Sequence, residues 1–203
     1  MDTLTYILNN YNLDKNQSKH ELHRSRYRSL PRLFRKLGFK VGAEIGVEKG
    51  MYSKYLLARN PNLKLYSIDS WMPYGEFGFG KSADRQNRYY EEAKVRLAPY
   101  NCEIIRDYSM NAVKKFEDES LDFVYIDASH AYENVKNDIE MWSKKVRRNG
   151  IVAGDDYYVF KSGNDGVVRA VDEWVKKEKI KPLFIFTKDS RHFSWFYVRG
   201  KHV

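Results

Sequence analysis

The spacing of apolar and polar residues along the chain predicts an alternation of strands and helices. Short apolar runs bounded by polar residues or glycines are typical of buried strands, and apolar residues three and four apart are typical of helices. Runs that predict strands span residues 41–45, 63–68, 102–105, 121–126 and 151–153. Stretches with helical spacing follow them at residues 51–58, 89–97, 132–142 and 166–178.

Two further apolar runs, 182–186 and 193–198, are separated by a polar turn, as in an antiparallel hairpin. Five strand–helix units and a closing hairpin predict an α/β fold with helices on both faces of the sheet. The expected sheet is Rossmann-like and doubly wound, with seven strands that are mostly parallel and an antiparallel strand from the C-terminal hairpin. The 203 residues are expected to form a single domain.

Two segments fall outside this alternation. Residues 1–40 predict a helical cap, with a short helix at 2–10 and a longer one at 19–37 that breaks near Ser29, because Pro31 removes a helical N–H. Residues 71–88 mix aromatics with glycines and show no periodicity. This composition favours a lid-like insertion that covers an acceptor pocket. A surface loop held down by its own aromatics is the alternative. The candidate contacts of such a lid are Trp71, Tyr74, Phe77 and Phe79.

A strand, a tight glycine turn and a helix meet at residues 41–58. Glu44 ends the apolar run, and Gly46 and Gly50 follow it. Glycines would let a ligand approach the backbone closely, although a bare strand-to-helix turn is the simpler alternative. The dinucleotide pattern G-x-G-x-x-G is absent, and the carboxylates of Glu44 and Glu48 suit a ligand that carries positive charge.

An acidic residue followed by G-x-x-x-G resembles the first motif of the class I S-adenosylmethionine-dependent methyltransferases. The resemblance covers residues 41–178 and implies that the methionine moiety of S-adenosylmethionine lies over the turn of Glu44, Gly46 and Gly50. Asp69, at the end of the next strand, would accept from the ribose hydroxyls, with Ser70 beside it. On the adenine side, the resemblance implies Asp107, Tyr108 and Ser109, and it places Asp127 next to the cofactor.

Acidic residues also gather after the fourth and fifth predicted strands. Asp127, Asp155 and Asp156 are expected to converge there, and adjacent carboxylates repel one another unless a cation joins them. Oxygen ligands without a cysteine favour Mg²⁺ or Ca²⁺. This arrangement is similar to the magnesium site of the catechol-type and macrocin-type O-methyltransferases. The alternative is that these aspartates are solvated turn and helix-capping residues.

His130 stands three residues after Asp127, where the catechol-type enzymes carry a lysine that takes the proton of the acceptor hydroxyl. A histidine titrates near neutral pH and can serve as a general base, so His130 and Asp127 are the candidate catalytic residues. A histidine at the start of a helix with no catalytic duty is the alternative.

Composition adds limits on partners and compartment. A net charge of +9 would attract an anionic acceptor or nucleic acid, but the basic residues are spread over amphipathic helices. We therefore expect a methyltransferase that acts on an oxygen of a small-molecule acceptor with S-adenosylmethionine and Mg²⁺; a nucleic-acid-binding or RNA-modifying protein is the alternative. The single Cys102, the lack of a long apolar run and the absence of a signal-peptide layout predict a cytoplasmic protein without a membrane span.

Overall fold

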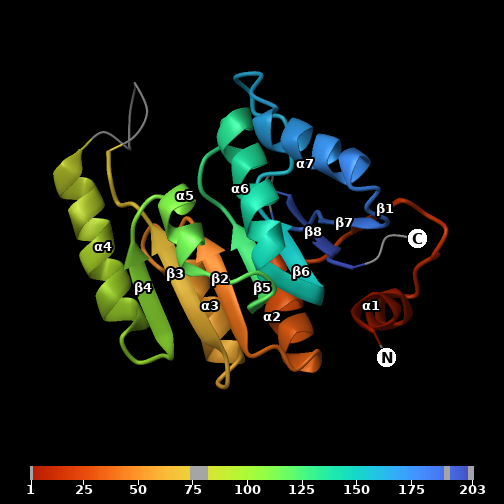
Figure 1. The fold of residues 1–203 in the computed structure, drawn as a ribbon, viewed down its shortest axis with the longest axis horizontal. Helices are drawn as coiled ribbons and strands as arrows, with labels where there is room; N and C mark the ends of the chain where they lie inside the picture. The colour runs from red at the N-terminus through yellow and green to blue at the C-terminus, as the bar shows by residue number, and fades with distance from the viewer. Residues whose placement is uncertain (1, 74–81, 190–192, 201–203) are drawn as a thin grey trace.

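A single eight-stranded sheet lies between two layers of helices. The computed structural model describes residues 2–73, 82–189 and 193–200 (Figure 1). The strand order is β1-β7-β8-β6-β5-β2-β3-β4. The strands are β1 (Lys19–Leu22), β2 (Val41–Ile45), β3 (Lys64–Asp69), β4 (Cys102–Arg106), β5 (Leu121–Ile126), β6 (Val146–Gly154), β7 (Leu183–Phe186) and β8 (Ser194–Val198). The helices are α1 (Thr3–Tyr11), α2 (Arg26–Lys36), α3 (Met51–Arg59), α4 (Ala83–Leu97), α5 (Ser109–Ala112), α6 (Tyr132–Lys145) and α7 (Gly166–Lys177), with a 3-10 turn, η1 (Val113–Lys115), after α5.

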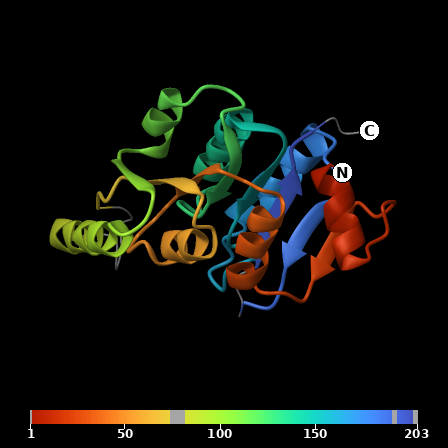
Figure 2. The same cartoon turned by 90° about the horizontal axis from the view of Figure 1, so that it is seen from below.

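Strand β5 shows how the sheet separates two apolar cores. Successive side chains of a strand point to opposite faces. Phe123 and Tyr125 therefore pack with α2, α3 and α4, whereas Val124 and Ile126 pack with α5, α6 and α7. Figure 2 shows these two helical layers on either side of the sheet. Every one of these four side chains is buried, as expected for a central parallel strand covered on both faces.

The predicted fold class is confirmed. Strands β2 to β6 pair in parallel, and β8 lies antiparallel between β6 and β7. The sheet has one strand more than expected, because β1 adds to its edge beside β7 in parallel. No helix in the described part of the chain combines the length and the apolar character that crossing a bilayer would require.

The prediction for the N-terminal 40 residues was wrong in two respects. Residues 19–22 form strand β1 rather than helix, and His20 and Leu22 are the buried members of its alternating pattern. Helix α2 begins only at Arg26 and runs without a break through Pro31, whose ring is buried with Leu30 and Phe34. Packing of that apolar face stabilises the helix despite the hydrogen bond that proline cannot donate.

The segment after β3 is shorter than the lid predicted for residues 71–88. Helix α4 begins at Ala83, and Ser82 caps it by accepting a hydrogen bond from the Arg85 backbone N–H. Trp71 is only 1% exposed and donates from Nε1 to the carbonyl of Glu48, so it belongs to the core and not to an acceptor contact. Tyr74, Phe77 and Phe79 lie outside the described residues.

Candidate functional site

The acidic residues expected at strand ends do gather along one edge of the sheet. Strands β6, β5, β2, β3 and β4 are neighbours in that order and run parallel, so their carboxyl ends lie side by side. Glu44 and Asp69 lie at the ends of β2 and β3, and Asp107, Asp127 and Asp155 directly follow β4, β5 and β6. This edge is where ligands bind in open α/β sheets.

Gly46 is required by the protein's own packing. Its φ is +89°, and a Cβ there would lie 2.0 Å from the backbone oxygen of Asp127. The turn after β2 is thus pressed against the chain leaving β5. Any side chain at this position would force the two strand ends apart, which is a requirement for glycine additional to the expected approach of a ligand.

Gly50 meets a second constraint. It has φ +73° at the N-cap of α3, and a Cβ would lie 3.1 Å from Leu97 of α4. The packing of the protein therefore favours glycine at both positions of the motif, for reasons that sequence spacing alone does not reveal.

Glu44 points into the layer between the sheet and α3. Its carboxylate accepts a short hydrogen bond from the Ser53 hydroxyl, and Ser53 lies 2.9 Å from the hydroxyl of Ser67. Burial raises the pKa of Glu44 to about 8, an effect that the hydrogen bond from Ser53 opposes. Burial thus favours the neutral, protonated form of Glu44 near neutral pH.

Asp69 closes the glycine turn through hydrogen bonds. Its Oδ2 accepts from the backbone N–H groups of Val47 and Glu48, both at 2.9 Å, and its Oδ1 accepts from that of Trp71. A carboxylate has about four acceptor positions, so three such bonds leave room for one ligand hydroxyl. Asp69 therefore orders the loop on which the expected cofactor would rest.

Of the adenine-side candidates, Tyr108 is exposed, whereas Asp107 and Ser109 are half-buried. Asp107 accepts from its neighbour's backbone N–H and from Asn111 and Lys115, which lowers its pKa, and Tyr108 is 57% exposed at the N-cap of α5. Ser109 instead turns inward: it donates to Asp138 and accepts from Trp142. Ser70, after β3, accepts from the backbone of Met72.

Asp127, His130 and Asp156 form the tightest group of potential metal ligands among the described residues. One ligand atom from each lies within 4.8 Å of the others. His130 Nε2 is 2.6 Å from Asp156 Oδ2, and this hydrogen bond raises the pKa of His130. The three residues line a small hollow of about 10 Å³, room for about one water molecule. Trp195 also lines it, and its buried Nε1 has no hydrogen-bond partner among the described residues.

Asp155, the third carboxylate expected in this group, turns to a different partner. It forms a close ion pair with Arg26 of α2, and its other oxygen accepts from the Ser194 hydroxyl at 2.8 Å. Arg26 Nη1 also lies 3.7 Å from Asp127 Oδ2, so the guanidinium stands beside two of the three aspartates.

Arg26 is the site residue that the sequence analysis missed. Its guanidinium donates to the hydroxyls of Tyr125 and Tyr27 and lies over the rings of Tyr27, Tyr52 and Tyr125. In the sequence it is one arginine of a basic helix, and only the fold brings it to the end of β5. Because Arg26 turns inward, part of the basic cluster on α2 is unavailable to nucleic acid.

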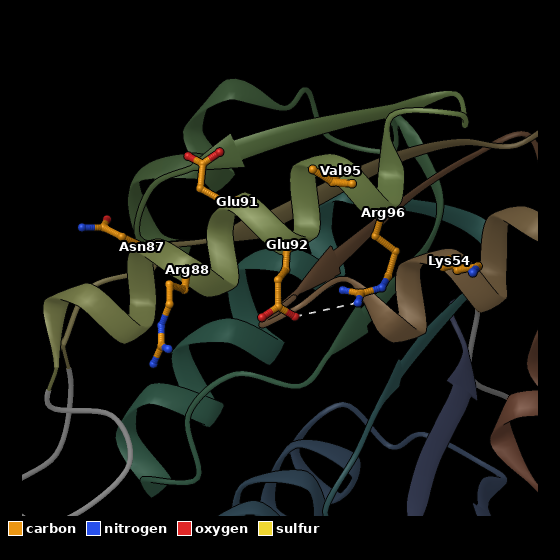
Figure 3. A pocket seen from close by; sticks show the side chains of 7 residues that line it. All are labelled: Lys54, Asn87, Arg88, Glu91, Glu92, Val95 and Arg96. Atoms are coloured by element: carbon orange, nitrogen blue, oxygen red, sulfur yellow. Dashed lines mark ion pairs between the residues drawn. The ribbon is translucent and has the colours of Figure 1, made fainter.

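A wider hollow of about 850 Å³ lies elsewhere, on the outer surface of α3 and α4. It is lined by Lys54 and by residues of α4 that include an ion pair between Glu92 and Arg96 (Figure 3). It is open to solvent, with Val95 76% exposed. The strand-end acids do not line it, so the acidic site and this hollow are separate features.

Comparisons with known proteins place the chain in a family. The sequence profile of a family described as "Methyltransferase domain" matches residues 43–157, from the glycine turn to just beyond Asp156. An uncharacterized protein of Sinorhizobium fredii, y4gI, is 27% identical over 104 residues, which are 48% of this chain but 10% of that protein. The chain thus spans only a small part of the length of this curated relative.

Two solved structures share the fold over nearly the whole chain. An O-methyltransferase from Bacillus cereus in complex with SAH has a TM-score of 0.62 and 18% identity, with coverage of 97% of this chain and 90% of that one. TomG, an O-methyltransferase from Streptomyces achromogenes in complex with SAM, has a TM-score of 0.62 and 15% identity, covering 98% and 91%. At such low identity these likenesses establish the fold.

A pair of glycine substitutions tests the packing of the turn. Gly46→Ala should lower the free energy of unfolding by more than the strain of a positive φ alone, about 1–3 kcal/mol, because its Cβ would meet the Asp127 carbonyl. Gly38→Ala is the matched control, since Gly38 has φ +70° but no atom within 4 Å of the added Cβ. Urea denaturation measures both, and equal losses would contradict the proposed contact.

The pKa of Glu44 predicts a pH-dependent stability. The folded state retains the proton of Glu44 up to about pH 8, whereas the unfolded state releases it near 4.5. Wild-type stability should therefore fall as pH rises between these values, by at least about 1.4 kcal/mol, the equivalent of one pKa unit. Glu44→Gln should remove this fall, and Glu103→Gln, at an exposed position, should not. Parallel pH–stability curves for wild type and Glu44→Gln would exclude the effect.

Proposed function

The chain belongs to the S-adenosylmethionine-dependent methyltransferases, whose domain profile its residues 43–157 match, and we propose that it methylates an oxygen of a small-molecule acceptor with help from a divalent cation. The observation that carries the proposal is the group of Asp127, His130 and Asp156 at the carboxyl ends of β5 and β6. This group directly adjoins the glycine turn, because Gly46 packs on the backbone of Asp127.

The residues along the other strand ends fit a cofactor with a cationic amino-acid part and a ribose. Glu44 would face the positively charged methionine end, and that cation would draw the proton from its carboxyl group. Asp69 retains an acceptor position for a ribose hydroxyl and holds the turn in place. Tyr108, 57% exposed beside Asp107, offers a ring to the adenine.

The donor set also fits a divalent cation. Asp127 and Asp156 would supply carboxylate oxygens, the ligands that Mg²⁺ and Mn²⁺ prefer. The hollow beside them has room for one ion or water molecule. When bound, S-adenosylmethionine supplies an activated methyl group, and the cation lowers the pKa of an acceptor hydroxyl.

His130 is the residue that we propose takes the proton of the acceptor, at Nδ1, because Nε2 bonds to Asp156. Its Nε2 is held by Asp156, so the imidazole has a fixed orientation and an increased affinity for a proton. The ring is partly exposed, with 42% of its side chain accessible, and can be reached by an acceptor that enters from solvent. The main contribution of the protein is then to align the acceptor oxygen with the methyl group, and deprotonation is the second.

Methyl transfer itself provides the first test. Wild-type protein with labelled S-adenosylmethionine should transfer label to members of a panel of hydroxyl-bearing small molecules, anionic ones included, and Mg²⁺ or Mn²⁺ should increase the rate. Transfer to amine analogues alone would disprove oxygen as the target, and transfer to RNA alone would favour the nucleic-acid alternative. Unchanged transfer in a chelator would remove the metal from the proposal.

The base is tested separately from the cofactor site. His130→Ala should lower kcat by roughly 10²–10⁴-fold, the usual contribution of a positioned general base. Binding of S-adenosylhomocysteine, measured by calorimetry, should remain unchanged, because the proposed cofactor contacts are on other residues. His23→Ala, at an exposed position outside the site, is the matched control. Wild-type turnover in His130→Ala would exclude His130 as the base.

A further inference from the structure

Arg26 is a buried cation at the edge of the acidic group. Its side chain is 11% exposed, and its Nη1 makes a close ion pair with Asp155 and lies 3.7 Å from Asp127 Oδ2. A guanidinium in this position competes with any other cation for the same carboxylates. Its positive charge therefore opposes the binding of a metal ion to these carboxylates, and this repulsion is stronger at a partly buried site than in bulk water.

Both oxygens of Asp155 are already engaged. Oδ2 pairs with Arg26, and Oδ1 accepts from Ser194, whose side chain is buried in β8. Asp155 is itself 6% exposed. Coordination of a metal by Asp155 would require this ion pair to break, and separating a buried ion pair is costly.

Several groups hold the guanidinium in place independently of Asp155. Nη1 and Nη2 donate to the hydroxyls of Tyr125 and Tyr27, at 2.7 and 3.0 Å. The guanidinium carbon lies 4.8 to 5.8 Å from the ring centroids of Tyr27, Tyr52 and Tyr125. The backbone N–H of Arg26 donates to Asp189, which anchors the first turn of α2. Arg26 is therefore a preorganised cation and not a surface arginine that has folded inward.

We propose that Arg26 is a built-in counter-cation that holds Asp155 out of the metal coordination and limits the divalent site to Asp127 and Asp156, beside His130. The inference rests on the metal site of the proposed function and adds the residue that determines how many carboxylates it can use. The three aspartates carry three negative charges; Arg26 balances one, and a divalent ion balances the other two. Without Arg26, Asp155 becomes available as a third anionic ligand.

The sign of the effect makes the proposal testable. Removal of a residue that supports a metal site normally weakens binding, whereas removal of Arg26 should strengthen it. Arg26→Met and Arg26→Gln should bind Mn²⁺ and Mg²⁺ at least about tenfold more tightly than wild type, because carboxylate number and charge set the affinity of such sites. Calorimetry on the full chain without cofactor measures this directly. Arg28→Met, which removes the same charge from an exposed position on α2, should leave the affinity unchanged.

A double variant tests whether the gain in metal affinity requires the carboxylate of Asp155. In Arg26→Met/Asp155→Asn the pair is replaced by neutral groups, so the net charge of the group equals that of wild type. The gain in affinity should disappear, leaving values within about threefold of wild type. Persistence of the gain in the double variant, or its absence in both single Arg26 variants, would overturn the proposal.

The outcomes also distinguish this inference from the proposed function. If wild-type protein binds neither Mn²⁺ nor Mg²⁺ but Arg26→Met or Arg26→Gln does, the cation-assisted mechanism fails and the role of Arg26 stands. If wild type binds and Asp156→Asn abolishes binding, the metal site stands, and the Arg26 variants alone decide the role of the arginine. Thermal unfolding of each variant, measured in parallel, confirms that folded proteins are compared.

Discussion

The contact between Gly46 and the backbone of Asp127 determines the arrangement of the whole site. Two parallel strands, β2 and β5, end side by side, and the chains that leave them approach so closely that no Cβ fits between them. This approach joins the turn expected to carry the cofactor to the acidic group expected to act on the acceptor. A methyl donor and an acceptor must react within a narrow range of positions, so such a rigid connection is what alignment of the reactants requires.

The second constraint is the cost of burying the negative charge of a carboxylate. Glu44, Asp138 and Asp155 show three ways in which the fold meets this cost. Glu44 is kept as a neutral acid by burial, with a pKa of about 8 and a hydroxyl partner in Ser53. Asp138 of α6 has its pKa raised to about 6 by burial and accepts a hydrogen bond from Ser109 of α5. Asp155 instead pairs with the positive charge of Arg26. Glu44 is thus a carboxyl group that a cationic ligand can ionise, whereas Asp155 already has a cationic partner in Arg26.

Much of the fold could be predicted from the sequence because central parallel strands have a distinctive composition. The run from Leu121 to Ile126 is apolar except for Asp122, and its other five residues are buried, so the sequence indicated a central strand there. The edge strand β1 was missed because its four residues, with two buried and two exposed, carry a weak signal that their pairing with β7 decides. Pro31 was read as a helix break because local rules do not include the tertiary packing that holds α2 together.

The candidate site was predictable only where it depends on strand ends. Topology brings Asp127 and Asp156 together, and the order of elements predicts that topology. The partner of Asp155 is instead a residue that lies between β1 and β2 in the sequence. Arg26 and Tyr125, which it contacts, are 99 residues apart. Neither residue type nor spacing distinguishes Arg26 from its basic neighbours on α2. What distinguishes Arg26 is its place at the start of α2, where the chain turns from the edge strand β1 toward the end of β5. This turn brings a cation to carboxylates that could otherwise bind a cation from solution.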